Sequence, residues 1–500
     1  MEASPTFDSK DGRLSVAVDG QIPETLLRLL YGDGTADTGS DVGSDIAQGG
    51  MSYGRLMRKS ICATSTGGDY MALAYADRFM LLERPQGPPS TNYSLVSVSS
   101  DAAAAGETVT ALYCMDIYAA GRAQPQTNQS LCVLAGYSSG HLRIFSQLGH
   151  LLTSHQFHPQ SLLHIRHRMP AAQLAPEGDS EEVCLTYVDG TMVNIDGRSL
   201  YLALRLCLNE AMSEDELEGL AFQYKKWAFD LNIPCVSDAV SYGPPAFKDP
   251  LASLAKSSYT SSPLLSDATA RFLVAPYHGD AAFGVFVTNE DAAMSFSAVD
   301  IAGKMAARVT GAVLNIAKSY LWRRGSPLSG SSESAGAGSS PKRTEPGATV
   351  PCAFAVRDSP RKALSISLAP AQYGLAALTD SLGRVLVFDL ANCETTLMLK
   401  GLRGSQCAWI ETQKDVRRMY VVVYATKRGI LEVYELGSAG RPLASANIGP
   451  GWTLVQNPTQ PLGGSLLVGS GGGERQAMAP LPASCVLVNE KGQVARVLMK

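Results

Sequence analysis

Short apolar segments recur along the chain, each followed by a turn and a second segment in which apolar residues alternate. A clear copy runs Leu375-Ala376-Ala377-Leu378, then a turn over residues 380–383, then Val385-Leu386-Val387-Phe388. Turn residues of this kind accept positive φ, and the alternation places one face of a strand inward, so each copy predicts a β-hairpin. The expected hairpins begin at Met71, Leu131, Val183, Phe272, Leu375, Tyr420 and Cys485.

The spacing of these hairpins predicts the architecture. Turn glycines are 50 residues apart between Gly140 and Gly190, 46 between Gly383 and Gly429, and 63 between Gly429 and Gly492. A period of ~40–50 residues with two clear strands in each copy is typical of β-propeller blades. Seven copies predict an all-β, seven-bladed, WD40-like β-propeller with helical insertions and a disordered loop. The alternative is a β-sandwich built from unrelated hairpins.

Two insertions interrupt the repeat. Residues 200–265 start with a helical apolar stretch, continue through an acidic segment and reach Tyr224-Lys225-Lys226-Trp227. Residues 292–350 hold apolar residues at helical spacing over 298–324, and then a stretch rich in Ser, Gly, Ala and Pro. That second stretch cannot bury enough apolar surface to fold, so we expect a disordered loop.

The N-terminal part of the chain is expected to lie outside the propeller. Residues 32–50 have the same small and polar character as the second insertion. We therefore expect residues 1–50 to form a flexible N-terminal segment and residues 51–500 to form the propeller domain.

Composition narrows the class of protein and its compartment. The 42 basic and 46 acidic residues give a net charge of −4, which excludes the strongly basic surface of a non-specific nucleic-acid binder. Met1 starts a polar and acidic segment rather than a secretory signal, and no apolar run reaches the ~20 residues that span a bilayer. The ten cysteines contain no C-x-x-C pair. We expect a reduced, cytoplasmic protein.

Motifs that could carry catalysis fail on their context. Gly136-Tyr137-Ser138-Ser139-Gly140 matches the G-x-S-x-G nucleophile elbow, but a second strand follows it where that motif needs a helix. Five histidines cluster without a Cys or carboxylate partner at ligand spacing, so we expect solvated histidines on an outer strand. These are His150, His155, His158, His164 and His167. We predict no catalytic residue, no cofactor and no metal.

The segment 298–324 has an additional property. Its polar face carries Lys304, Arg308 and Lys318, and it ends on Trp322 and Arg323. A basic amphipathic helix with a terminal aromatic residue can lie in a membrane interface. The alternative is a helix packed on the propeller or on a partner protein.

Several short motifs occur in an order that resembles a known family. In this order the chain is similar to the N-terminal region of the regulatory, non-catalytic subunit of the Rab-three GTPase-activating protein complex, over about residues 60–450. The motifs are Val183-Cys184-Leu185-Thr186-Tyr187, Val193-Asn194-Ile195-Asp196-Gly197, Tyr224-Lys225-Lys226-Trp227, Leu378-Thr379-Asp380-Ser381-Leu382-Gly383-Arg384-Val385, Lys400-Gly401-Leu402-Arg403, Trp409-Ile410-Glu411-Thr412 and Arg428-Gly429-Ile430-Leu431-Glu432-Val433.

The resemblance implies partner proteins rather than a reaction. It implies a heterodimer with a catalytic subunit that carries the GTPase-activating arginine, and a small GTPase of the Rab family as the target. It also implies nucleotide exchange on a Rab of the endoplasmic reticulum, vesicle trafficking and autophagy, and therefore a peripheral location at that membrane. The opposing hypothesis is a propeller hydrolase or lyase with a metal in the central channel.

Two groups of residues are candidates for contact with these partners. Tyr224, Lys225, Lys226, Trp227 and Trp409 are the candidate partner-binding residues, with core packing as the alternative for the two tryptophans and simple solvation for the two lysines. The basic helix defined above is the candidate for membrane or partner contact.

Overall fold

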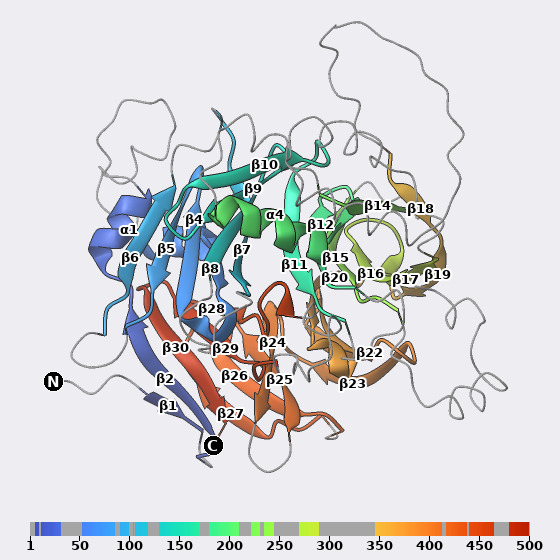
Figure 1. The fold of residues 1–500 in the computed structure, drawn as a ribbon. Helices are drawn as coiled ribbons and strands as arrows, with labels where there is room; N and C mark the ends of the chain where they lie inside the picture. The colour runs from blue at the N-terminus through green and yellow to red at the C-terminus, as the bar shows by residue number, and fades with distance from the viewer. Residues whose placement is uncertain are drawn as a thin grey trace, which may run out of the picture.

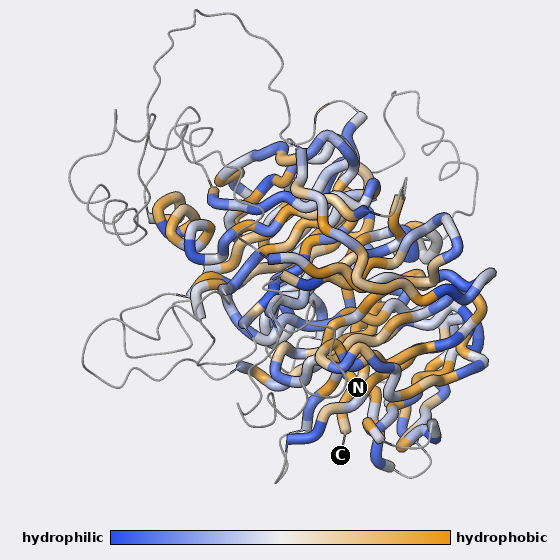
Figure 2. Tube along the Cα trace, turned by 90° about the vertical axis from the view of Figure 1, so that its right-hand side faces the viewer, coloured by the Kyte–Doolittle hydropathy of each residue, from blue (hydrophilic) through white to orange (hydrophobic). Residues whose placement is uncertain are grey.

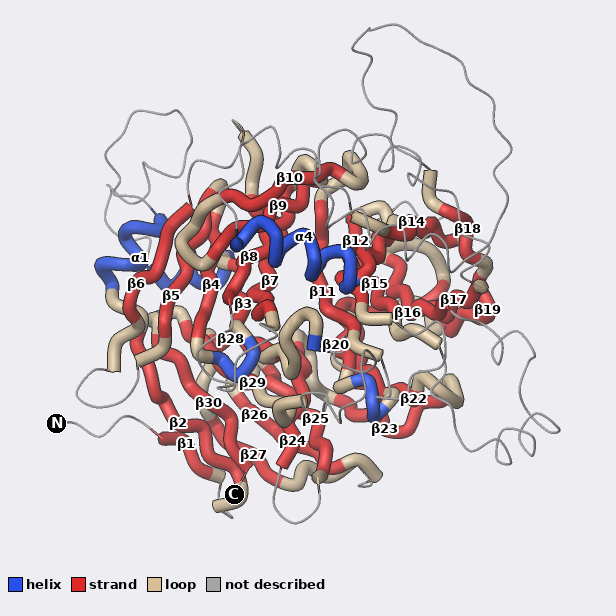
Figure 3. The backbone as a smooth tube through the Cα atoms, viewed as in Figure 1, coloured by secondary structure: helices blue, strands red, loops and turns tan. Residues whose placement is uncertain are grey.

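A computed structural model places the seven hairpins in seven separate sheets around one axis (Figure 1). The structure describes residues 6–9, 12–31, 53–85, 91–99, 104, 106–118, 130–170, 180–209, 222–230, 235–244, 270–289, 346–412, 417–437, 440–464 and 480–499. Figure 3 shows that strands dominate these residues and that helices are few. The prediction of a seven-bladed β-propeller is confirmed.

Each blade has four or five strands, which are named here in order from the axis outward. Blade 1 consists of β3 (Ile61–Thr64), β4 (Tyr70–Tyr75), β5 (Arg78–Glu83) and β6 (Ser94–Ser99). Blade 2 consists of β7 (Val109–Ile117), β8 (Ser130–Tyr137), β9 (His141–Ser146) and β10 (Leu151–Gln156). Blade 3 consists of β11 (Leu162–Arg168), β12 (Glu182–Tyr187), β13 (Met192–Asp196), β14 (Tyr224–Phe229) and β18 (Ala348–Val350). Blades 4 and 5 are β15 (Val236–Ser241), β16 (Ala270–Pro276), β17 (Ala281–Thr288), β19 (Cys352–Arg357); and β20 (Ala363–Leu368), β21 (Leu375–Asp380), β22 (Arg384–Asp389), β23 (Glu394–Lys400). Blades 6 and 7 are β24 (Ser405–Thr412), β25 (Arg418–Ala425), β26 (Ile430–Glu435), β27 (Ala444–Asn447); and β28 (Trp452–Gln456), β29 (Cys485–Asn489), β30 (Gln493–Met499), β2 (Leu14–Gln21), β1 (Thr6–Asp8).

The hairpins expected from sequence are the second and third strands of every blade. In blade 5, for example, β21 pairs antiparallel with β22 from Leu375–Asp389 to Thr379–Val385. These strands are covered on both faces by neighbouring blades, so their apolar residues dominate the sequence pattern. Figure 2 shows the result, with hydrophobic segments concentrated along the strands of the interior.

The N-terminal segment closes the ring. β2 pairs antiparallel with β30, with Val16 opposite Val497, and supplies the fourth strand of blade 7 (Figure 1). Leu14, Val16 and Val18 are buried against blades 6 and 7. The expectation that residues 1–50 form a flexible segment is therefore wrong for β1, β2 and α1 (Glu24–Tyr31), because alternating apolar side chains bury one face of β2.

The insertion expected over residues 200–265 also needs correction. It contains two blade strands, β14 and β15, because Tyr224-Lys225-Lys226-Trp227 pairs with β13 and is not a free loop. The helical stretch is confirmed as α4 (Gly197–Asn209), which lies between the third and fourth strands of blade 3. Leu200 and Leu204 are fully buried in the cluster between blades 2 and 3.

The extended segment 348–357 pairs with strands of two neighbouring blades. β18 runs parallel to β14 at the edge of blade 3, and after Pro351 the chain continues as β19, the outer strand of blade 4. Gly347 allows this approach, because a Cβ there would lie 2.9 Å from the backbone carbon of Trp227. The segment 292–345, with its expected helix and loop, lies outside the described residues.

Three further short helices connect the strands. α3 (Tyr53–Lys59) leads into blade 1, η1 (Thr66–Gly68) follows β3, and η3 (Ala371–Tyr373) follows β20. None of the described helices is both long and apolar enough to cross a membrane.

Hydrogen bonds join the inner strands, or residues beside them, at all seven blade junctions. In blade order from the junction of blades 7 and 1, the pairs are Thr64 Oγ1 with Asn457 Oδ1 (2.7 Å), Thr66 N with Asp116 Oδ2 (2.8 Å), Thr110 Oγ1 with Leu162 O (2.6 Å), Arg166 Nη2 with Asp238 Oδ2 (2.8 Å), Ile366 N with Asp238 Oδ2 (2.8 Å), Trp409 Nε1 with Ser367 O (3.1 Å) and Trp409 N with Gln456 Oε1 (2.6 Å). Each blade thus supplies hydrogen-bond partners for polar groups at the axial edge of its neighbour.

Candidate functional site

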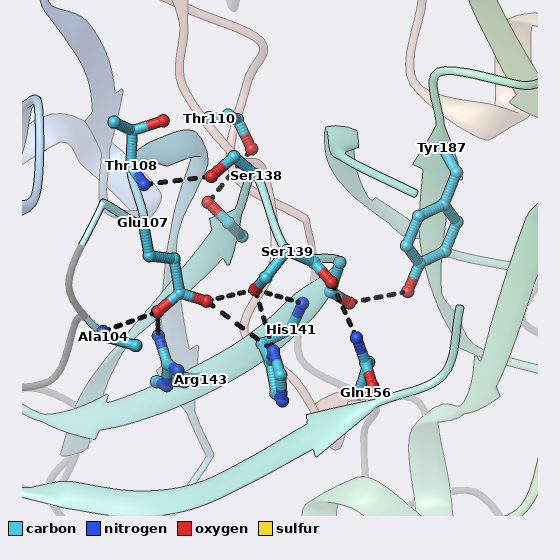
Figure 4. Close-up of polar contacts among 12 residues, drawn as sticks. Ala104, Glu107, Thr108, Thr110, Ser138, Ser139, His141, Arg143, Gln156 and Tyr187 are labelled. Carbon is cyan, nitrogen blue, oxygen red and sulfur yellow. Dashed lines mark hydrogen bonds and ion pairs between the residues drawn. The ribbon is translucent and has the colours of Figure 1, made fainter. Parts of the chain in front are cut away.

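The G-x-S-x-G segment is a hairpin turn between β8 and β9, as its context predicted. The hydroxyl of Ser139 nevertheless lies in a polar cluster with Glu107, His141 and Arg143 (Figure 4). Glu107 belongs to the loop that enters β7, whereas His141 and Arg143 project from β9. This Ser139 cluster is the arrangement that most resembles catalytic machinery among the described residues.

In the Ser139 cluster, protons are donated from His141 to Ser139 and from Ser139 to Glu107. Ser139 Oγ contacts the carboxylate of Glu107, which can only accept, so the hydroxyl proton is donated to Glu107. His141 Nδ1 lies 2.8 Å from the same hydroxyl and 3.6 Å from Glu107 Oε1. His141 Nδ1–H therefore donates to Ser139, and this tautomer cannot accept the serine proton. A catalytic triad needs the opposite order, with the carboxylate on the far side of the imidazole.

Arg143 fixes the charge of this cluster. Arg143 Nη1 donates to Glu107 Oε2 at 2.7 Å, and its guanidinium lies 4.2 Å above the ring of Tyr137. Burial alone would raise the pKa of Glu107, but the hydrogen bonds from Arg143, Ser139 and the backbone of Ala104 hold that pKa below its ordinary value. Burial, together with nearby Arg143, lowers the pKa of His141 against the opposing effect of Glu107. Because Arg143 ion-pairs with Glu107, and because His141 presents its N–H rather than a free nitrogen to Ser139, neither group is placed to activate the hydroxyl as a strong base.

Other blades carry a polar link at the same place. In blade 3, His158 Nε2 lies 2.6 Å from Asp189 Oδ2, and the Asp189 carboxylate also accepts from the backbone of Thr191 at 3.0 Å. In blade 5, Arg384 pairs with Asp358 at 3.0 Å. The Ser139 cluster is therefore blade 2's version of a link between the loop entering a blade and the turn of its central hairpin.

A backbone hydrogen bond repeats in the same position and makes this face rigid. The first turn residue after the second strand donates its N–H to the carbonyl of the loop that enters the blade. The pairs are Ser138 with Thr108 (2.8 Å), Val188 with Ser161 (3.0 Å), Tyr277 with Cys235 (3.1 Å), Ser381 with Lys362 (2.9 Å) and Glu490 with Gly451 (3.1 Å). We call the side of the propeller that carries these turns the turn face.

The histidines are distributed differently from the expectation. His150 is exposed and His155 is on the outer strand β10, but His158 lies in the loop that enters blade 3, and His164 and His167 are on the inner strand β11. The outer-strand assignment is therefore wrong for these three. His167 Nε2 lies 2.7 Å from Glu181 Oε1, and His164 Nε2 lies 3.6 Å from Asp238 Oδ1. Burial lowers the pKa of His164 to about 4, against the opposing effect of Asp238.

Carboxylates thus accompany the histidines, which the sequence spacing had not indicated. The described part of the chain contains no group of three or more His, Cys, Asp or Glu side chains placed to hold a metal ion.

The candidate partner-binding residues divide into two sets. Trp227 packs against Phe272 at 5.4 Å between ring centroids, Lys226 Nζ donates to Phe157 O at 3.0 Å, and Trp409 joins blades 5 and 6. All three are buried, so the expectation that they reach a partner is corrected to core packing. Tyr224 and Lys225 remain half-exposed at the edge of blade 3, and their contact with a partner stays a prediction.

The residues of the basic helix, Lys304, Arg308, Lys318, Trp322 and Arg323, lie outside the described residues. Sequence reasoning also missed Glu107 and Arg143. Arg143 gave a usable signal, since it is a charged residue inside the apolar strand β9.

Comparisons with known proteins agree with the resemblance seen in the sequence. The family model described as "Rab3 GTPase-activating protein regulatory subunit N-terminus" matches residues 56–455. A Caenorhabditis elegans protein named "Rab3 GTPase-activating protein regulatory subunit" is 36% identical over 76 residues, which cover 15% of this chain and 6% of that protein. The match thus spans a small part of a much longer relative.

Solved structures with a similar arrangement share little sequence. Sqt1 of Saccharomyces cerevisiae is 12% identical with a TM-score of 0.39, over 88% of this chain and 83% of its own. BamB of Moraxella catarrhalis is 10% identical with a TM-score of 0.37, over 88% and 82%. The family model, which extends from α3 through all six following blades into β28, is the finding that assigns the chain. The chain belongs to the family of Rab3 GTPase-activating protein regulatory subunits.

Proposed function

We propose that this propeller binds the catalytic subunit of a Rab GTPase-activating complex and supports GTPase activation without contributing a catalytic residue. The observation that carries the proposal is the family match, which coincides with the propeller over residues 56–455. The Ser139 cluster supports it, because its only hydroxyl nucleophile donates its proton to an ion-paired carboxylate.

Rigidity is what the propeller would contribute to such a complex. A scaffold whose loops are already ordered loses little conformational entropy when a partner binds, so more of the contact energy appears as affinity. Hydrogen bonds close the ring at the axis, and further ones secure the turns on the turn face. Tyr224 and Lys225, at the edge of blade 3, are our candidates for contact with the catalytic subunit.

We extend the proposal to the finer roles that the family resemblance implies. The complex would also promote nucleotide exchange on a Rab and serve vesicle trafficking and autophagy, from the cytoplasm and the surface of the endoplasmic reticulum.

The segment 298–324 is the candidate membrane contact. Flotation with anionic liposomes should weaken with salt and in the variant Lys304→Glu/Arg308→Glu/Lys318→Glu. Unchanged flotation, or none, would favour packing of this segment on protein.

The experiment for the main proposal is co-elution of the purified chain with the purified catalytic subunit in size-exclusion chromatography. We expect one complex of defined stoichiometry, and weaker binding for Tyr224→Ala/Lys225→Glu than for the control Leu202→Ala, an exposed position on α4. Separate elution at concentrations up to tens of micromolar would contradict the proposal. So would turnover of a substrate by the chain alone.

A further inference from the structure

Exposed apolar side chains gather on the turn face of blades 4 and 5. Tyr277 is 56% exposed in the turn of blade 4, Leu382 is 41% exposed in the turn of blade 5, and Leu364 is 43% exposed on the inner strand of blade 5. Large apolar residues are rare in turns, whose usual residues are Gly, Pro, Asn, Asp and Ser. Their accumulation on one face is a mark of an interaction surface.

Hydrogen bonds hold these turns against one another. Lys362 Nζ reaches across from blade 5 to the carbonyl oxygens of Gly279 and Ala281 in blade 4, the second at 3.2 Å. The backbone N–H of Lys362 donates to Ser381 Oγ at 3.2 Å, next to Leu382. The blade 4 turn and the blade 5 turn therefore form one continuous surface.

The surface continues onto blade 6, where it becomes basic. Leu402 N donates to Gly383 O at 2.8 Å, which joins the blade 5 turn to the loop that carries Arg403. Thr426 Oγ1 donates to Gly404 O at 2.7 Å, which joins that loop to the turn that carries Lys427 and Arg428. Tyr277, Leu364, Leu382, Arg403, Lys427 and Arg428 together define what we call the blade 4–6 patch.

The cations of this patch are not neutralised within the described structure. Arg403, Lys427 and Arg428 are exposed, and none forms an ion pair with a carboxylate of the described residues. The neighbouring arginines differ, because Arg384 pairs with Asp358 and Arg361 with Asp380. The patch thus has an apolar end and an end with surplus positive charge.

We propose that the blade 4–6 patch binds an acidic, amphipathic segment of a partner protein. The apolar end would take that segment's apolar side chains, while the three cations would pair with its carboxylates. A protein segment fits better than an anionic membrane, because the exposed Asp280 lies in the blade 4 turn beside the apolar end and would repel a uniformly negative surface. The inference rests on the protein-binding role proposed above and assigns it a surface.

The test uses fluorescently labelled synthetic peptides and the full chain, with binding read by fluorescence anisotropy. The probe is a 14-residue peptide that alternates Glu and Asp with Leu and Phe at helical spacing. Two matched peptides replace either its acids by Gln and Asn or its apolar residues by Ser. Vesicles of phosphatidylcholine with 30% phosphatidylserine are a separate arm. Because the assay contains neither a Rab nor a catalytic subunit, a failure to bind these peptides leaves the proposed function untouched.

We expect the acidic amphipathic peptide to bind at least tenfold more tightly than either matched peptide. Arg403→Glu/Lys427→Glu should weaken binding at least tenfold, and Leu382→Ser several-fold. The control is Arg13→Glu/Arg198→Glu, which changes the net charge by the same amount at two exposed positions outside the patch, one just before β2 and one at the start of α4. This control should change the affinity for the peptide by less than twofold. Equal weakening by the control pair, equal binding of the three peptides, or binding to the vesicles alone would overturn the proposal.

Discussion

Gly140 shows how closely neighbouring blades approach at the turn face. It closes the turn between β8 and β9 with a φ of +84°, and its carbonyl lies 3.5 Å from the hydroxyl of Tyr187 in blade 3. A Cβ at this position would stand 1.9 Å from His158 O and 2.6 Å from Gln160 O. Glycine is therefore required at this position both for the left-handed backbone and for space.

Replacement of this glycine should be costly. We expect Gly140→Ala to lower the free energy of unfolding by about 3 kcal/mol, through backbone strain and a clash with rigid backbone atoms. Gly106→Ala is the matched control, because Gly106 has a φ of +81° but open space around it, and should cost about 1 kcal/mol. Urea unfolding measures both variants. Equal losses would mean that the blades do not meet as closely as described.

The Ser139 cluster makes the fold sensitive to acid. A neutral His141 is favoured in the folded protein, because burial and Arg143 lower its pKa below the ordinary value of 6.5. The unfolded chain then binds more protons, so the free energy of unfolding falls as the pH drops through 6.5. Glu107 acts in the same direction at lower pH, since its folded pKa is below 4.5 and its stabilisation is lost as the pH falls through that range.

His141→Asn tests this linkage, since the amide can still donate to Ser139. Between pH 7.5 and 5.5 we expect a smaller loss of unfolding free energy in the variant than in the wild type, measured by urea unfolding at each pH. Identical pH slopes would show that His141 does not contribute.

At the scale of elements, the central hairpins could be predicted and their flanking strands could not. Strands such as β21 and β25 are covered on both faces and are therefore continuously apolar. The inner strand β11 lines the axis and carries His164, Arg166 and His167, and the outer strand β23 alternates exposed with buried residues. Neither kind of strand leaves a distinctive apolar run.

Contacts between distant parts of the chain limited the prediction of the site in the same way. Glu107 and Arg143 are 36 residues apart and meet only because a strand pairing brings them together. β2 and β30 come from opposite ends of the chain. The alternation of Leu14, Val16 and Val18 is visible in the sequence and predicts a strand. The neighbouring residues do not indicate which strand it pairs with. For Trp227 and Trp409 the sequence leaves core packing and partner contact open, because an aromatic residue is typical of both, and the structure decides for packing.

The closing strand gives an element-scale prediction. Val16→Lys places a charge in the buried face of β2 and should lower the free energy of unfolding by about 4 kcal/mol. Ala17→Lys, on the opposite face of the same strand, should cost about 1 kcal/mol or less. Thermal unfolding followed by circular dichroism measures both. Equal small effects would indicate that blade 7 does not depend on the N-terminal strand.

At the scale of the whole molecule, seven blades form one ring, which two kinds of contact hold closed. The inner strands are joined at every junction by hydrogen bonds, and β2 joins the two ends of the chain in blade 7. The turns are secured on one face, where the blade 4–6 patch lies. A closed ring with ordered turns on one face is the rigid surface that the proposed scaffold role requires.

The most direct test of this account is the rate of GTP hydrolysis on a Rab, measured in single turnover with the catalytic subunit, with the chain, and with both. We predict no acceleration by the chain alone and a higher rate with both than with the catalytic subunit alone, an increase that Ser139→Ala leaves unchanged. Acceleration by the chain alone that is lost in Ser139→Ala would contradict the non-catalytic role. No difference between the catalytic subunit with and without the chain would contradict the regulatory one.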